Sequence, residues 1–315
     1  MKPIPESLTG GPFLRRQALD ADVTPKMLRG QRFVRLHPRV YVVRSHELTW
    51  EDLVAAGRLA LPDRVHLTGI SRIQASGLDF GPRFPVRFVI EGDHHLAIDG
   101  IFLHRTKKLP PVDAVGVTIE AAFIFYCAQA RVIDAIKVGD WLLHQRLMDL
   151  DALAALAVAE LWRPGAHEAC WILPHLDPDS WSLKESETRS VLTFAGLPRP
   201  ECNKPVDPSR SISSIADLVY RRWGLFIEYE GGHHQEDRGQ YVSDLDRYEG
   251  FRDHGHRYLQ VTDERLRQPR RLVRRVHDLL VAGGYDGPAP VFGERWRTLF
   301  AQLSTVVGSR QPGRR

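Results

Sequence analysis

The sequence predicts an α+β protein in three parts: an N-terminal winged helix-turn-helix, a mixed α/β middle domain, and a C-terminal mixed sheet flanked by helices. Two short helical segments precede two strand-like ones near the N-terminus, helices and strands alternate through the middle, and three strand-like segments follow a helix near the C-terminus. The predicted domains span residues 1–45, 46–175 and 182–284, with 285–315 as an extension whose tail, GSRQPGRR, is expected to be disordered.

Composition limits the class of protein without choosing one. A length of 315 residues suits two or three domains. Lys and Arg number 43 against 39 Asp and Glu, and a pI near 9.0 permits a polyanionic partner without requiring one. Three widely spaced cysteines argue against a disulfide framework. Because no long apolar run suggests a signal peptide or membrane span, we expect a soluble cytoplasmic protein.

The N-terminal segment has helix-turn-helix spacing. Phe13 to Asp20 is predicted as the first helix, and Thr24 as N-cap with Pro25 at the first helical position predicts the second. The segments RFVRL and RVYVV then read as the strands of a small wing. A second helix in the major groove, with wing arginines on phosphates, is one interpretation, and a solvated basic face is the other. The predicted DNA-binding residues are Arg15, Arg16, Lys26, Arg29, Arg32 and Arg35.

The run FLRRQALDADVTPKMLRGQRFVRLHPRVYVV resembles the winged-helix head of AbiEi-type antitoxins over about the first 45 residues. The resemblance implies binding to operator DNA. A toxin partner follows from family analogy alone.

Acidic residues in the C-terminal segment are predicted to converge. Asp217 and Glu228 flank a turn at Trp223-Gly224, so neighbouring hairpin strands would present both carboxylates at one edge. Glu230 shares a strand face with Glu228, and Glu185 projects from a preceding helix. Such carboxylates suit Mg²⁺ or Mn²⁺, which would activate water against a phosphate, with Asp217, Glu228 and Glu185 as predicted ligands.

His234 follows the same strand after Gly231-Gly232 and is predicted to handle a proton or contact the phosphate. The alternative for this whole set is a strand of solvated acids followed by a histidine-bearing turn. At the start of the last predicted helix, arginines either track a phosphate backbone or form a solvated face. These residues are Arg267, Arg270, Arg271, Arg274 and Arg275.

The segments SLKESETRSVLTFAGLPRPECNKPV, DLVY, IEYEGGHH and DLDRYEGFRDHGHRYLQVT resemble the family related to very-short-patch-repair endonucleases, over about 100 residues. The resemblance implies a restriction-endonuclease-like PD-(D/E)XK fold. Glu230 stands where nucleases of the wider superfamily commonly carry lysine. The matching positions implied to form the site are Glu185, Asp217, Glu228, Glu230, His234, Asp244 and Arg247.

Two functions are expected from these patterns. The first is a Mg²⁺-dependent DNA endonuclease or nicking enzyme that hydrolyses phosphodiester bonds, with Arg247 as a clamp on the site. The second is a non-catalytic DNA-binding regulator, similar to a type IV antitoxin, whose nuclease-like domain has lost its chemistry. The acid at position 230 favours the regulator, whereas the retained acids and His234 favour the enzyme.

Overall fold

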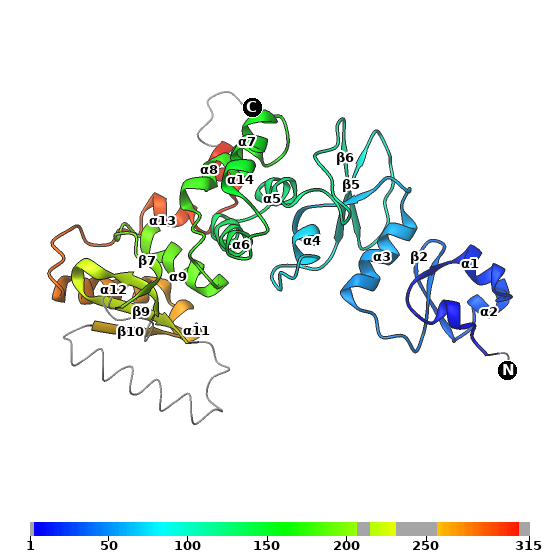
Figure 1. Cartoon of the computed structure of the whole chain (residues 1–315), viewed down its shortest axis with the longest axis horizontal. Coiled ribbons are helices and arrows are strands. Elements are labelled where there is room, and N and C mark those ends of the chain that lie inside the picture. The colour runs from blue at the N-terminus through cyan, green and yellow to red at the C-terminus, as the bar shows by residue number, and fades with distance from the viewer. Residues whose placement is uncertain (1–2, 207–214, 231–256, 309–315) are drawn as a thin grey trace. The chain divides into compact units, whose positions relative to one another are not determined.

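The computed structural model describes residues 3–206, 215–230 and 257–308, and Figure 1 follows the course of the chain. The chain forms two compact units that divide between Phe125 and Tyr126. Both units combine helices with small sheets, so the predicted α+β class is confirmed. Across the described ranges, none of the helices is long and apolar enough to cross a lipid bilayer.

The first unit begins with two short helices and a three-stranded sheet in the order β1-β3-β2. Thr24 caps the second helix as predicted: its hydroxyl accepts a hydrogen bond of 3.3 Å from the Met27 amide, and Pro25 takes the first helical position. The two predicted wing strands are confirmed as an antiparallel pair. The elements are 3₁₀ helix η1 (Glu6–Leu8), β1 (Phe13–Leu14), α1 (Arg15–Asp20), α2 (Pro25–Leu28), β2 (Phe33–His37) and β3 (Val40–Val43).

The predicted first helix was wrong at its start. Phe13 and Leu14 form a short strand that pairs with Tyr41 and Val40, and α1 begins only at Arg15. The Phe13 ring also packs edge-on against Phe33, with ring centres 6.0 Å apart. The partner strand β3 lies about 27 residues further along the chain, so the local sequence pattern around Phe13 did not indicate this pairing.

The rest of the first unit surrounds a second three-stranded sheet in the order β4-β5-β6, in which β5 and β6 are parallel. The predicted strands VRFVI and IFLHR are confirmed as β5 and β6. Gly57 lets a helix approach this sheet closely, since a Cβ there would lie 2.8 Å from the Phe88 ring. The elements are α3 (Trp50–Ala60), β4 (His66–Leu67), α4 (Gly69–Gln74), β5 (Val86–Glu91), β6 (Ile101–Thr106) and the start of α5 (Ile119–Cys127).

The second unit begins with helices that pack against each other and form hydrogen bonds with the C-terminal segment of the chain. The Ile133 amide donates to the Leu299 carbonyl at 2.9 Å, and the Leu303 amide donates to the Ala130 carbonyl at 2.9 Å. The predicted extension from residue 285 is therefore part of this unit as far as residue 308, and the predicted disordered tail lies outside the described residues. The helices are α6 (Val132–His144), α7 (Leu150–Ala159), α8 (Ala166–Ile172), η2 (Leu173–His175), α9 (Leu183–Phe194), α13 (Glu294–Thr298) and α14 (Leu303–Gly308).

A four-stranded mixed sheet in the order β10-β9-β8-β7 follows α9. The predicted antiparallel strands β7, β8 and β9 are confirmed, and β10 runs parallel to β9. Gly224 adopts a left-handed φ of 58° in the turn before β9, a conformation that glycine takes at little cost. The predicted helix from Tyr241 to His254 lies outside the described residues. The elements are β7 (Glu201–Pro205), β8 (Ile215–Tyr220), η3 (Arg221–Trp223), β9 (Leu225–Tyr229), β10 (Arg257–Val261), α11 (Asp263–Leu266) and α12 (Pro269–Ala282).

The polar stretch from 176 to 181, expected to separate two domains, is built into the second unit instead. The Arg199 guanidinium donates to the Leu176 carbonyl at 2.8 Å, and the Asn203 amide donates to the Asp179 carbonyl at 2.7 Å. Ser180 is buried, with its hydroxyl 2.9 Å from that of Ser186. The division into compact units falls about fifty residues before this stretch, whose polar groups are bonded by Ser186 of α9, Asn203 of β7 and Arg199 between them.

Candidate metal centre and nucleic-acid interface

Asp217 and Glu228 occupy facing positions on adjacent strands. β8 pairs with β9 in antiparallel fashion, and Leu218 is the partner of Ile227. Asp217 precedes Leu218 and Glu228 follows Ile227, so the same register places Asp217 opposite Glu228. Directly opposed residues of an antiparallel pair project to the same face of the sheet. The Asp217 carboxylate also accepts a hydrogen bond of 2.7 Å from the Tyr229 amide, which fixes it against β9. The structure therefore brings these two predicted ligands together on one face.

Polar residues also occupy the positions next to this pair on the two outer strands, β7 and β10. On one side, the pairs that flank Asn203 in β7 place it opposite Asp217. On the other side, Gln260 of β10 is the partner of Glu228 in the parallel ladder. Asn203, Asp217, Glu228 and Gln260 thus hold neighbouring backbone positions across the four strands. Asn203 has a left-handed φ of 48°, and its side chain donates to the Asp179 carbonyl and to Glu185.

The acids of β9 take their partners from β10. The Tyr258 hydroxyl donates to Glu228 at 2.9 Å, and Glu228 is only 7% exposed. The Gln260 amide donates to Glu230, two residues further along β9. Sequence reasoning missed Tyr258 and Gln260, although their spacing of two residues on a strand places both on one face. These donors hold both carboxylates at defined positions on the sheet.

Glu185 enters from the first turn of α9. The Ser182 side chain caps this helix by accepting from the Glu185 amide at 3.1 Å. One carboxylate oxygen of Glu185 accepts from the Trp181 amide at 2.9 Å and from the Asn203 side chain at 2.6 Å. Glu185 is therefore bound to β7 through Asn203, and its contacts also stabilise the start of the helix.

Lys184 belongs to the opposite side of β9. Its ammonium lies 2.6 Å from the Asp263 carboxylate and 5.8 Å from the centre of the Tyr229 ring. Tyr229 stands between Glu228 and Glu230 on the strand, so its side chain projects to the other face. Burial and a hydrogen bond to Asp263 raise the pKa of Tyr229 to about 12. Lys184 is thus engaged by Asp263 on the face of β9 opposite to that of Glu228 and Glu230.

The remaining predicted site residues, His234, Asp244 and Arg247, lie outside the described residues. Over residues 3–206, 215–230 and 257–308, no group of three or more His, Cys, Asp or Glu side chains is arranged to hold a metal ion. Within the described part, the predicted set thus reduces to the facing pair Asp217 and Glu228, whereas Glu185 is bound to Asn203 of the neighbouring strand β7.

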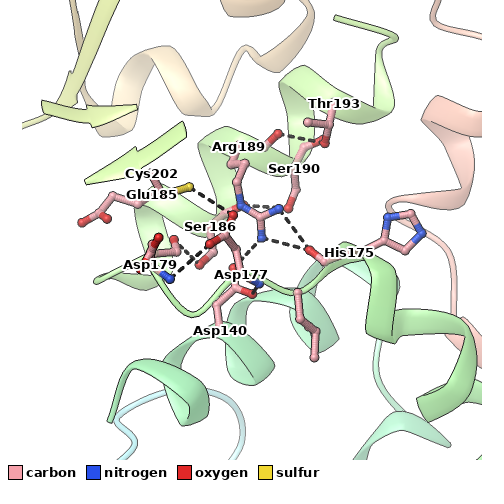
Figure 2. Close-up of polar contacts among 12 residues, drawn as sticks. Asp140, His175, Asp177, Asp179, Glu185, Ser186, Arg189, Ser190, Thr193 and Cys202 are labelled. Atoms are coloured by element: carbon pink, nitrogen blue, oxygen red, sulfur yellow. Dashed lines mark hydrogen bonds and ion pairs between the residues drawn. The ribbon is translucent and has the colours of Figure 1, made fainter. Parts of the chain in front are cut away.

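A buried ion pair joins α9 to α6, as Figure 2 shows. A terminal nitrogen of Arg189 lies 2.6 Å from the Asp140 carboxylate, and both terminal nitrogens donate to the His175 carbonyl at 3.0 Å. The side chains are 2% and 0% exposed. Burial raises the pKa of Asp140 to about 6, in spite of the neighbouring guanidinium. This pair joins α6, η2 and α9, so we assign it a structural role.

The predicted nucleic-acid residues lie on the helices and wing of the first unit. Arg15 and Arg16 start α1, Lys26 is on α2, and Arg29 follows α2 directly. Arg35 and the half-buried Arg32 belong to the wing, and the other five side chains are exposed. The hydrophobic core beneath them includes the buried residues Ala18, Val23, Leu28 and Phe33. The basic residues are therefore held on a packed scaffold.

A second basic surface covers the start of α12. Leu272, Val273 and Val276 are buried on one side of this helix, whereas its arginines are exposed. The guanidinium groups of Arg270 and Arg274 lie 5.6 and 5.4 Å from the centre of the Phe292 ring. Both guanidinium groups thus make cation–π contacts with the same ring. This arrangement agrees with both interpretations of the cluster, a phosphate-binding surface and a solvated face.

Comparison with known proteins gave no match: no family model, curated protein or solved structure is similar to this chain.

Proposed function

We propose that this chain is a DNA-binding endonuclease or nicking enzyme that depends on Mg²⁺ or Mn²⁺ and hydrolyses phosphodiester bonds. The observation that carries the proposal is the pair of carboxylates Asp217 and Glu228, facing each other across β8 and β9. The order of α9, three antiparallel strands and a parallel fourth strand supports it, because the resemblance to very-short-patch-repair endonucleases implies the same order of site-bearing elements.

The donor set fits a hard divalent cation. Mg²⁺ is usually held by one or two carboxylates together with water and substrate phosphates, and Asp217 and Glu228 supply two carboxylates from neighbouring strands. When bound, the metal activates a water molecule and offsets charge that develops on the phosphate. Tyr258, by donating to Glu228, orients that carboxylate toward a fixed position. Glu185, His234 and Arg247 enter the proposed centre on the sequence alone.

A second function is favoured by a different observation. Glu185 is engaged by the Trp181 amide and Asn203, Glu230 is engaged by Gln260, and Lys184 is committed to Asp263. A nuclease-like domain in which side chains satisfy one another in this way suits a DNA-binding regulator, with a toxin as partner by family analogy. The two functions share the DNA-binding head and differ in whether the acids hold metal.

Plasmid nicking separates the two functions. We expect the full chain to convert supercoiled plasmid DNA to the nicked form with Mg²⁺ or Mn²⁺, and EDTA to abolish the reaction. The Asp217→Asn variant should bind DNA as the native protein does and leave the plasmid intact. Failure of the native protein to nick supercoiled or mismatched plasmid, while it still binds DNA, would establish the regulator instead.

We further propose that the head is a winged helix in which α2 enters the major groove and β2 and β3 contact phosphates. Each of the variants Lys26→Ala and Arg29→Ala should weaken DNA binding and reduce the slope of log affinity against log salt by about 1. Fluorescence anisotropy at several salt concentrations measures both quantities. Lys107→Ala is the matched control, because Lys107 is an exposed cation of the same unit that follows β6. Equal slopes for all three variants would reject this assignment.

A further inference from the structure

Three aromatic rings follow one another at intervals of four residues along the segment that contains α13 (Figure 1). Phe292 packs edge-on against Trp296 with ring centres 4.9 Å apart, and Trp296 packs against Phe300 with ring centres 5.4 Å apart. Trp296 is only 3% exposed, whereas Phe300 is 37% exposed. The tryptophan therefore anchors the three rings in the core, and Phe300 stands at the surface.

A pocket lies where these rings meet the start of α12. Its volume is about 380 Å³, within the range of roughly 300–1,000 Å³ that ligand pockets occupy. The lining combines two of the rings, Trp296 and Phe300, with the arginines of α12 Arg270, Arg271 and Arg274. The pocket thus offers aromatic surface and positive charge side by side.

The arginines of this pocket are not neutralised by the chain. Arg270, Arg271 and Arg274 are exposed, and none of them forms an ion pair with a residue that the structure describes. Arg270 and Arg274 lie one turn apart on α12 and contact the same Phe292 ring. Like charges at this spacing repel and destabilise a helix slightly. A bound polyanion would remove this repulsion.

The rings distinguish between the polyanions that could bind here. An acidic peptide or a DNA duplex would use the arginines alone, because a carboxylate does not stack on a ring and paired bases stay inside the double helix. A single strand of nucleic acid uses both features, since its phosphates meet cations and its unpaired bases stack on aromatic side chains. The exposed Phe300 beside three arginines therefore favours a single strand.

We propose that this pocket and the start of α12 bind single-stranded nucleic acid. One base stacks on Phe300, and the neighbouring phosphates meet the guanidinium groups of Arg271 and Arg274. The surface includes neither the acids Asp217 and Glu228 nor any residue of the N-terminal head. It stands independently of the proposed endonuclease and of the regulator.

Fluorescence anisotropy of a labelled oligothymidylate with the full chain tests the stacking contact. Phe300→Leu should raise the Kd about tenfold and leave the salt dependence unchanged, because leucine keeps apolar bulk but offers no ring to a base. Trp162→Leu is the matched control and should bind as the native protein does. Trp162 is 54% exposed and lies 4.3 Å from the Arg163 guanidinium, but it does not line the pocket. The Tm of each variant reports whether the fold is intact.

Charge variants of α12 give a second, different signature. Arg274→Gln should reduce the slope of log affinity against log salt by about 0.7, the loss of one phosphate contact on a single strand. Arg275→Gln removes the same charge from an exposed position of the same helix that does not line the pocket, so the slope should stay at the native value. Equal slopes for these two variants would reject the phosphate contact.

An abasic oligonucleotide of the same length separates recognition of bases from recognition of phosphates. It should bind the native protein about tenfold more weakly than oligothymidylate does, and Phe300→Leu should not weaken it further. Equal affinities for the two strands would overturn the proposal, because the surface would then accept any polyanion. The proposal also fails if Lys26→Ala weakens strand binding as much as Arg274→Gln does, since the head would then hold the strand.

Discussion

Replacing Asp140 by alanine should lower the free energy of unfolding of the second unit by about 3–5 kcal/mol. The variant leaves the Arg189 guanidinium buried at 2% exposure with its closest carboxylate removed. A buried charge without its partner loses the attraction that offset its transfer from water. The Asp177 amide, which donates to Asp140 at 2.8 Å, loses its acceptor as well. Urea denaturation followed by tryptophan fluorescence measures the effect, since six of the seven tryptophans lie beyond residue 126.

The double variant Asp140→Leu with Arg189→Met separates two contributions to the free energy of unfolding. One is the cost of a buried charge without its partner, and the other is the net contribution of the ion pair. Replacing both partners by apolar residues is expected to be neutral or stabilising, by up to about 4 kcal/mol. The raised pKa of Asp140, about 6, points the same way, because it means that burial disfavours the charged carboxylate more than Arg189 favours it.

A partly exposed ion pair at the start of α6, the helix that carries Asp140, provides the control. Arg131 and Asp134 form a salt bridge of 2.6 Å in which the arginine is 51% exposed. Arg131→Met should therefore change stability by less than about 1 kcal/mol. If Asp140→Ala proved no more destabilising than Arg131→Met, the structural role assigned to the buried pair would be wrong.

Glu228→Gln should reduce metal-dependent nicking by at least about 100-fold if the proposed endonuclease is correct. The substitution removes one of the two facing negative charges but keeps an oxygen that accepts from the Tyr258 hydroxyl. The side chain keeps its size at a position that is 7% exposed, so the sheet should remain intact. Initial rates of plasmid nicking at saturating Mg²⁺, with the Tm of each variant, separate lost chemistry from lost folding.

Glu201→Gln serves as the matched control for that experiment. Glu201 is an exposed acid on β7 of the same sheet, where it forms a contact of 3.4 Å with Arg221. We expect this variant to nick DNA at the native rate. Equal rates for native protein, Glu228→Gln and Glu201→Gln would show that any observed cleavage does not come from the proposed centre.

Most secondary structure and the facing pair of acids could be predicted from the sequence. Thr24 with Pro25 defines a helix start by local hydrogen bonding, and alternation of apolar residues defines β8 and β9. The spacing of Asp217 and Glu228 around Gly224 then fixes a hairpin that makes them neighbours. These features depend on residues close together along the chain, so the sequence determined them alone.

Contacts between distant segments were decided only by the tertiary structure. Asp140 and Arg189 meet across 49 residues, Phe13 leaves a predicted helix to pair with β3, and β10 supplies Tyr258 as a donor to Glu228. The division between Phe125 and Tyr126 and the pocket beside Phe300 arise in the same way. Local patterns record which face of an element is apolar but not which partner covers it, because the partner is selected by packing and hydrogen bonding in three dimensions.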